Sequence, residues 1–178
     1  MSVLAEQLLN IHHALALAGV PHAFGGAIAL AYCTEEPRGT RDLDVNIFTG
    51  VDRAPEVLAC LPVGIGVSDA DLAAIERDGQ VRLWWDDTPV DLFFDVHEFH
   101  LRAAEGVREV PFAGDGIPVL GCTALAVFKV LFDRTRDWAD VEAMLAAGAL
   151  NGLEALGWAV RLLGAEDRRV AKLSELLA

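Results

Sequence analysis

The sequence predicts an α+β fold in which a mixed sheet with helices is followed by a C-terminal helical bundle. Two observations indicate this. Up to residue 121, short segments with the alternation or the apolar runs of strands are interspersed with segments of helical periodicity, and from Cys122 onward the pattern is helical only. We therefore expect an α/β core over 1–121 and a helical subdomain over 122–178 that packs on it. With 178 residues, 53% of them hydrophobic, the chain can bury a substantial interior.

The first half of the chain is expected to alternate between helices and strands. Helical spacing of apolar residues predicts a first helix that Gly19 ends, and Ser68 followed by Asp71 has the pattern of a capping box. The alternating polar and apolar residues of DLDVNIF predict a half-buried strand. In order, the expected elements are a helix over 3–18, the strand VPHAF, the helix AIALAYC, the strand DLDVNIF and helices over 54–60 and 69–77.

The second half begins with two strand pairs and ends in helices. An antiparallel hairpin is predicted for QVRLWW and VDLFFD, separated by DDTP, and a second pair for REVPF and GIPVL, separated by AGDG. Glycines punctuate the helical segments that follow. These helices are expected over 123–133, 137–147, 152–163 and 166–177.

Charge and composition limit the classes of function. A net charge of −13 argues against extensive nucleic-acid binding, because a surface that repels phosphate gains little from counterion release. A basic cluster in the C-terminal third is interpreted as solvated helix faces. No apolar run approaches the roughly 18 residues of a membrane helix. The N-terminus lacks a basic start and the three widely spaced cysteines suggest free thiols, so we expect a cytoplasmic protein without a membrane segment.

Three aspartates are candidates for a metal site. Asp42 and Asp44 lie two residues apart in a predicted strand, so both side chains point away from the apolar row. Two carboxylates at this spacing suit a pair of divalent cations, and without a cation their repulsion costs stability. Asp91 is favoured over Asp95 as the third carboxylate, because the two lie about 13 Å apart along one strand. The alternative for Asp91 is a residue at the edge of the hairpin.

Gly25 and Gly26 lie where a predicted strand runs into a helix. Backbone without side chains lets N–H groups approach a phosphate, and the helix dipole attracts an anion. A tight turn is the alternative for these two glycines. Lys129 lies in the apolar helix AVFKVLF, with Asp133 as its expected partner at i+4. Its ammonium group either snorkels out of the core or reaches into a polar pocket.

Four segments, taken in order, resemble the nucleotidyltransferase superfamily, and within it the small AbiEii-like and minimal nucleotidyltransferases: FGGAIAL, RGTRDLDVNIF, PVDLFFD and ALAVFKVLFDRTRDWADVEAML. The resemblance covers 20–147 and implies a polymerase-beta-like core. Ala27 departs from the family pattern, in which many members have a hydroxyl residue after the glycines. The site residues that the resemblance implies are Asp42, Asp44 and Asp91 as ligands of two Mg²⁺ ions, and Gly25, Gly26, Thr40 and Lys129 around the nucleotide.

The resemblance implies a Mg²⁺-dependent enzyme that moves a nucleoside monophosphate from an NTP to an acceptor hydroxyl on a protein, a tRNA end or a small molecule. The AbiEii-like group also implies one half of a toxin–antitoxin pair with an antitoxin partner chain. The alternative is a module of the same fold that senses nucleotides or binds a protein without turnover. The missing hydroxyl at Ala27 favours this alternative, and the three aspartates favour the enzyme.

Overall fold

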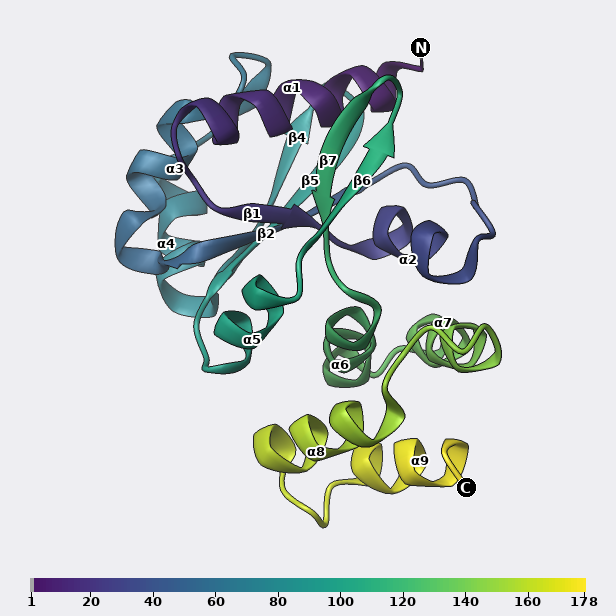
Figure 1. Ribbon diagram of the computed structural model, residues 1–178. Helices are drawn as coiled ribbons and strands as arrows, with labels where there is room; N and C mark the ends of the chain where they lie inside the picture. Colours follow the sequence, from purple (N-terminus) through teal and green to yellow (C-terminus); the bar gives the residue numbers. More distant parts are fainter. Residues whose placement is uncertain (1) are drawn as a thin grey trace.

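The computed structural model describes residues 2–178 as a seven-stranded mixed sheet with helices, which confirms the α+β class (Figure 1). The strands are β1 (His22–Phe24), β2 (Leu43–Gly50), β3 (Ile65–Gly66), β4 (Gln80–Trp85), β5 (Thr88–Asp95), β6 (Arg108–Phe112) and β7 (Asp115–Val119). The helices are α1 (Val3–Leu17), α2 (Gly26–Thr34), α3 (Ala54–Cys60), α4 (Asp69–Asp78), α5 (Phe99–Glu105), α6 (Cys122–Phe132), α7 (Thr135–Ala146), α8 (Gly152–Leu163) and α9 (Arg168–Leu176), with a 3-10 turn over Val51–Arg53. The strand order is β3-β4-β5-β2-β1-β7-β6.

Strand β2 occupies the middle of the sheet and decides which side chains face the site. It runs parallel to β5 and antiparallel to β1. Its apolar residues Leu43, Val45 and Ile47 are fully buried. Because side chains alternate along a strand, Asp44 and Asn46 point to the opposite face. Figure 1 shows α1 along one side of the sheet and α6 to α9 on the other.

The expected elements agree with the structure at most positions. Both predicted strand pairs form, but each with a two-residue turn in place of the expected DDTP and AGDG connections, so their registers differ from the predicted ones. Ser68 and Asp71 make the expected capping box at the start of α4. The sequence does not predict β3 or α5. Strand β3 has two residues, too few to show alternation, and α5 has seven residues with no side-chain cap at its start, whereas α3, of the same length, has a proline in its first turn. In the helical part, α6 packs against α7 and α8, and it also contacts α2 (Figure 1).

The prediction of three free cysteines is wrong for two of them. Cys33, near the end of α2, and Cys122, the first residue of α6, form a disulfide with a Cα–Cα distance of 5.6 Å. They are 89 residues apart in the sequence, and only the packing of α2 on α6 brings them together. Cys60 remains a free thiol. The argument from free thiols for a reducing compartment therefore no longer applies.

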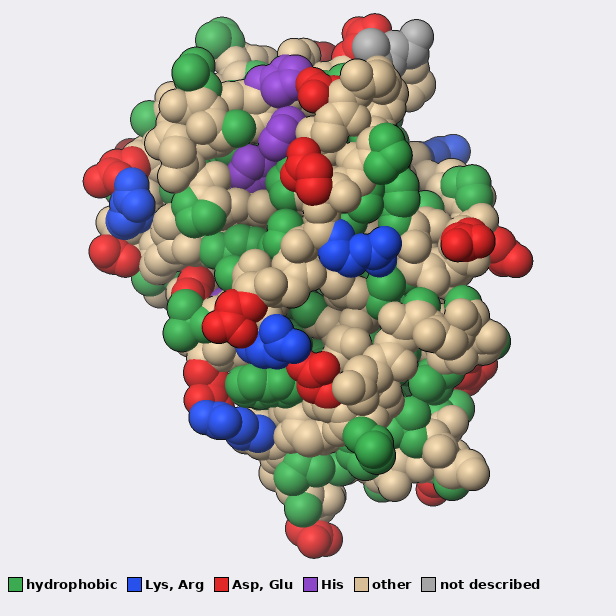
Figure 2. Space-filling model, viewed as in Figure 1, with side chains coloured by type: hydrophobic (Ala, Val, Ile, Leu, Met, Phe, Trp, Pro, Cys, Tyr) green, Lys and Arg blue, Asp and Glu red, His purple; other side chains and the backbone are tan. Residues whose placement is uncertain are grey.

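Basic and acidic side chains are interspersed over the face of the molecule seen in Figure 2. In the C-terminal third, Arg161 pairs with Glu98 and Arg169 pairs with Asp167. Much of the basic cluster is thus neutralised locally by acids. Among residues 2–178, no helix is long and apolar enough to cross a membrane.

Candidate active site

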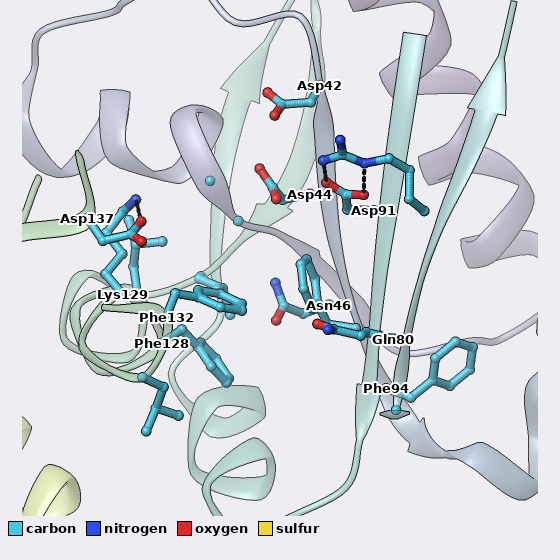
Figure 3. A pocket seen from close by; sticks show the side chains of 18 of the residues that line it. Asp42, Asp44, Asn46, Gln80, Asp91, Phe94, Phe128, Lys129, Phe132 and Asp137 are labelled. Carbon is cyan, nitrogen blue, oxygen red and sulfur yellow. Dashed lines mark hydrogen bonds and ion pairs between the residues drawn. The ribbon is translucent and has the colours of Figure 1, made fainter. Parts of the chain in front are cut away.

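A cavity of about 940 Å³ lies between the polar face of the sheet and the helices beside it (Figure 3). Helices α2, α4, α6 and α7 contribute to its wall together with strands β2, β4 and β5. Six of the residues predicted for the site line this one cavity: Gly25, Gly26, Asp42, Asp44, Asp91 and Lys129. The sheet and helices thus bring together residues from four separate segments of the chain.

The three aspartates face the cavity from neighbouring segments (Figure 3). Asp44 lies directly opposite Asp91 in the parallel pairing of β2 with β5, and Asp42 precedes β2. Burial, followed by the negative charges of Asp42 and Asp91, raises the pKa of Asp44 to about 6. The repulsion among these charges therefore acts most strongly on the carboxylate of Asp44, and a bound cation would reduce it.

Arg82 is a site residue that the sequence does not identify. Its guanidinium donates two hydrogen bonds to Asp91, from Nε to Oδ1 at 2.7 Å and from Nη2 to Oδ2 at 2.6 Å. The register of the hairpin would have identified it. Strands β4 and β5 are joined by a two-residue turn that pairs Trp85 with Thr88, and this register pairs Arg82 with Asp91. The four-residue turn DDTP that the sequence predicts would shift this register by two residues, so it does not place Arg82 opposite Asp91.

The structure explains by sterics why position 26 is glycine, which the sequence alone does not reveal. Gly26 has a φ of +50°, and a Cβ there would lie 1.8 Å from Asp44 Oδ2. The backbone N–H of Gly25 donates to the carbonyl oxygen of Asp44 at 2.8 Å, so it is not available to a ligand. The following N–H groups in the first turn of α2 have no partner within the helix. Glycine is thus required at 26 to let Asp44 approach the start of α2.

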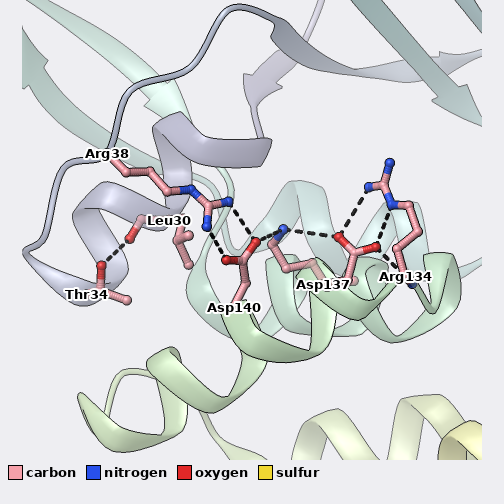
Figure 4. A network of polar contacts seen from close by, with 7 residues as sticks. Leu30, Thr34, Arg38, Arg134, Asp137 and Asp140 are labelled. Atoms are coloured by element: carbon pink, nitrogen blue, oxygen red, sulfur yellow. Dashed lines mark hydrogen bonds and ion pairs between the residues drawn. The ribbon is translucent and has the colours of Figure 1, made fainter.

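Lys129 is held in a chain of ion pairs beside the cavity. Figure 4 shows the ends of this chain, where Arg38 meets Asp140 and Arg134 meets Asp137. Its Nζ lies 2.6 Å from Asp140 Oδ2 and 3.4 Å from Asp137 Oδ1, and the side chain is 8% exposed. Arg38 pairs with Asp140, with Nη2 2.9 Å from Oδ2, and Arg134 pairs with Asp137, with Nε 2.6 Å from Oδ2. Two buried carboxylates thus share three cations, which come from α6, from the N-cap position of α7 and from the loop after α2.

The expected pairing of Lys129 with Asp133 is wrong. Asp133 ends α6 in the left-handed conformation, with a φ of 58°, which takes its side chain out of the i+4 position on the helix. It instead accepts a hydrogen bond from Trp138 Nε1 at 2.8 Å and pairs with Arg168. The cavity is also lined by Arg136, which forms no ion pair with any of residues 2–178.

Sequence comparisons with models of protein families and with curated proteins find no match. Solved structures do match. The chain is similar to ANT(2'')-Ia in complex with adenylyl-2''-tobramycin, with a TM-score of 0.64 and 15% identity over 99% of this chain and 100% of that chain. It is similar to the lincosamide antibiotic adenylyltransferase LnuA, lincomycin-bound, with a TM-score of 0.53 and 14% identity over 80% of this chain and 96% of that chain. The chain has a nucleotidyltransferase fold.

A third similar structure is an antigenic nucleotidyltransferase-like protein from Paracoccidioides brasiliensis, with a TM-score of 0.51 and 16% identity over 99% of this chain and 94% of that chain. The expected fold is thereby confirmed. The nucleotidyltransferase fold extends over the helical part as well as the sheet, because two of these matches cover nearly all of this chain.

The donor set of this nucleotidyltransferase fold suits a hard divalent cation. Carboxylate oxygens are the ligands that Mg²⁺ prefers. Three carboxylate side chains, those of Asp42, Asp44 and Asp91, line one cavity, and the pKa of Asp44 is raised. In this geometry, however, no three potential ligand residues among 2–178 are close enough together to enclose a metal. Arg82 holds Asp91, and Thr40 Oγ1 donates to Asp42 Oδ1 at 2.5 Å. Thr40 therefore orients a carboxylate, a contact different from the nucleotide contact expected for it.

Proposed function

We propose that this chain is a Mg²⁺-dependent nucleotidyltransferase that transfers a nucleoside monophosphate from an NTP to an acceptor hydroxyl and releases pyrophosphate. One observation carries the proposal: Asp44 and Asp91 lie opposite each other on parallel strands, beside Asp42 and a glycine turn that admits no side chain. Mg²⁺ held by these carboxylates would neutralise charge on the reacting phosphates. The similarity to ANT(2'')-Ia and LnuA supports ATP as the donor and a small molecule as the acceptor.

The residues of the chain have separate parts in this reaction. The first-turn N–H groups of α2 bind phosphate oxygens, helped by the helix dipole. Arg134 and Arg136 line the cavity on the same side as Lys129 and attract the triphosphate. Asp91 accepts the proton of the acceptor hydroxyl as that oxygen bonds to the α-phosphorus and the bond to pyrophosphate breaks. Lys129 stays with Asp137 and Asp140 and acts on the triphosphate by its charge alone.

A second candidate function is a nucleotide-binding module without turnover. The pair between Arg82 and Asp91 favours this function, because the guanidinium neutralises the third carboxylate in place of a metal ion. The Arg82 side chain is 54% exposed, so it is free to leave when a ligand arrives. Toxin–antitoxin function and membership of the AbiEii-like group stay predictions from the sequence.

Thermal unfolding with nucleotide and metal tests the proposal. A ligand that binds only the folded state at 100 times its Kd stabilises by about 2.7 kcal/mol, which raises the Tm of a chain of this size by roughly 5–10 °C. We expect this shift with ATP and Mg²⁺ together, and its loss in Asp42→Asn. Glu142→Gln, an exposed acid on α7, is the control. A shift without pyrophosphate release over a panel of hydroxyl compounds would select the second function, and no shift would exclude both.

A further inference from the structure

The floor of the cavity is formed by two rows of side chains that run across three strands. The register of β2, β5 and β4 places Asp44, Asp91 and Arg82 in the first row. One step further along the strands, the same register places Asn46, Phe93 and Gln80 in a second row. The first row is charged, whereas the second consists of an aromatic ring between two amides. The second row has no part in the reaction described above.

Asn46 is a buried amide with no partner. It is 4% exposed, and its side chain forms no hydrogen bond with any residue in the described part of the chain. Figure 3 shows it below Asp44, among the side chains that line the cavity. Its amide atoms are not among the enclosed polar atoms without a partner, which are Thr49 Oγ1 and His97 Nδ1 in the described residues, so the amide is open to the cavity that it lines. The Asn46 amide is therefore available to a hydrogen-bonding group of a ligand in the cavity.

The surroundings of the second row are apolar and uncharged. The rings of Phe93 and Phe132 have centroids 5.6 Å apart, and Phe128 lies further along α6 in the same wall (Figure 3). His97 and His100 line this end as well, and burial lowers the pKa of both, that of His100 to about 4. Both imidazoles are therefore neutral at pH 7.

The rim carboxylates near this end are already engaged by the chain itself. Asp71 accepts hydrogen bonds from the backbone and hydroxyl of Ser68, at 2.8 and 2.6 Å. Asp78 accepts two hydrogen bonds from Arg77 Nε, at 3.0 and 3.1 Å. Asp95, two residues beyond Phe93 on β5, lies 3.9 Å from His100 Nδ1 and is not among the residues that line the cavity. A ligand with several ammonium groups would thus meet only engaged carboxylates in the cavity wall beside the second row, apart from those of the charged row.

The direction of transfer assigns this end to the acceptor. In phosphoryl transfer the attacking and leaving oxygens lie roughly in line on opposite sides of the phosphorus. Of the arginines that suit pyrophosphate, Arg136 belongs to α7 and Arg134 caps its start, whereas β4 and β5 form the opposite side of the aspartates. The acceptor therefore approaches over β5 and β4, where Phe93 and Gln80 lie.

We propose that the second row is an acceptor subsite for an uncharged alcohol that carries a flat or apolar ring, and that it disfavours polyamines. This inference rests on the proposed function. The ring packs on Phe93 against Phe132, and a polar substituent bonds the Asn46 amide. Asp91, in the adjacent row, lies next to the hydroxyl that reacts.

Binding of two probes in the presence of Mg²⁺ and a non-hydrolysable ATP analogue tests the subsite. The probes are p-nitrophenyl β-glucoside, which is uncharged with a ring, and tobramycin, which is a polyamine. Calorimetry in about 0.3 M NaCl screens non-specific attraction of the polyamine to the acidic surface. We expect the glucoside to bind at least about tenfold more tightly than tobramycin, and Asn46→Ala and Phe93→Leu each to weaken it by roughly three- to tenfold.

The affinity for the ATP analogue distinguishes failure of the acceptor subsite from failure of the proposed function. The ATP analogue should bind Asn46→Ala and Phe93→Leu within about twofold of its affinity for the unaltered chain, because loss of a hydrogen bond or a ring contact to the nucleotide would exceed that factor. Glu142→Gln, on the exposed face of α7, is the control that should bind both the analogue and the glucoside unchanged. Equal weakening of the analogue would place the nucleobase on the second row and overturn the acceptor assignment. Tighter binding of tobramycin, or no binding of the glucoside, would also overturn it while the proposed function stands. No binding of the analogue to the unaltered chain would overturn both.

Discussion

Asp44 lies half-buried between Asp42 and Asp91, and its side chain forms no hydrogen bond with residues 2–178. Its pKa is about 6 in the folded chain, above the ordinary value of 3.8 for an aspartate carboxyl in an unfolded chain. Between these values the folded state holds a proton that the unfolded state has lost, so stability falls as the pH rises through this window. Above pH 6 the full penalty is present. The site is therefore strained by charge at neutral pH.

Asp44→Asn is expected to stabilise the chain at pH 7 by about 1–2 kcal/mol, after discounting for partial exposure, because it removes the central charge. At pH 3.5, where the carboxyl is protonated, the gain should vanish. Urea unfolding at the two pH values measures both. Glu142→Gln, on the exposed face of α7, should show no such pH-dependent gain. An equal gain at both pH values would contradict the charge explanation.

Gly26 and Asp44 are coupled by contact as well as by position. Gly26→Ala would place a methyl group where Asp44 Oδ2 lies and would impose a side chain on a φ of +50°. We expect a loss of about 1–3 kcal/mol of stability and a weaker nucleotide-induced Tm shift, because Asp44 must move.

Gly157→Ala is the matched control, since Gly157 lies within α8 and an added Cβ meets no atom within 4 Å. This change should be neutral or stabilising by up to about 1 kcal/mol, because alanine is the better helix former. If Gly26→Ala behaved like Gly157→Ala, the close approach of Asp44 to α2 would be disproved.

At the scale of elements, the ion-pair chain joins three segments. Arg38 follows α2, Lys129 belongs to α6, and Asp137 and Asp140 belong to α7. The two aspartates are almost completely buried, at 2% exposure each, so they depend on the cations around them. The network therefore fixes the helices on one side of the cavity in relation to each other.

Lys129→Met should destabilise the chain by about 2–4 kcal/mol, because it leaves two buried carboxylates with one arginine each. Lys172→Met is the control: Lys172 is exposed, with Nζ 4.4 Å from the centroid of the Trp138 ring, and its loss should cost less than about 1 kcal/mol. Chemical denaturation of both variants makes the comparison. Equal losses would show that the chain of ion pairs contributes little to stability.

Elements were predicted better than their contacts. Apolar periodicity located β2, and the alternation in it gave the orientation of Asp42 and Asp44. Register is different, because a turn of two residues or four gives the same strands with different neighbours. That difference concealed Arg82 opposite Asp91. Lys129 was recognised as unusual, but its partners are eight and eleven positions further along the chain, beyond what helical spacing within α6 shows.

At the scale of the whole molecule, the disulfide closes a loop of 89 residues that contains most of the sheet. No property of the sequence near Cys33 or Cys122 indicates this pairing, because it depends on the packing of α2 against α6. The boundary expected between 1–121 and 122–178 stays a prediction. The bond between Cys33 and Cys122 joins the two sides of that boundary.

A thiol count checks the cysteine pairing. The denatured, unreduced chain should show one reactive thiol, that of Cys60, and three after reduction. The double variant Cys33→Ala with Cys122→Ala is expected to lose about 2–4 kcal/mol of stability, because its unfolded chain is less constrained. Cys60→Ala is the control for the loss of a thiol alone. Three reactive thiols before reduction would contradict the pairing.

The disulfide and the ion pairs hold one side of the cavity more rigidly than the other. Helices α2, α6 and α7 are tied to one another at both ends of their contact, by Cys33–Cys122 and by the pairs of Lys129. The facing side consists of α4 and the strand β4, which hydrogen-bonds to β5 and to the two-residue β3 near the sheet edge. We therefore expect ligands of different width to displace the sheet margin more than the helices. Trp84 and Trp85 lie on that margin, so tryptophan emission should report such a displacement when ligands of different width are compared.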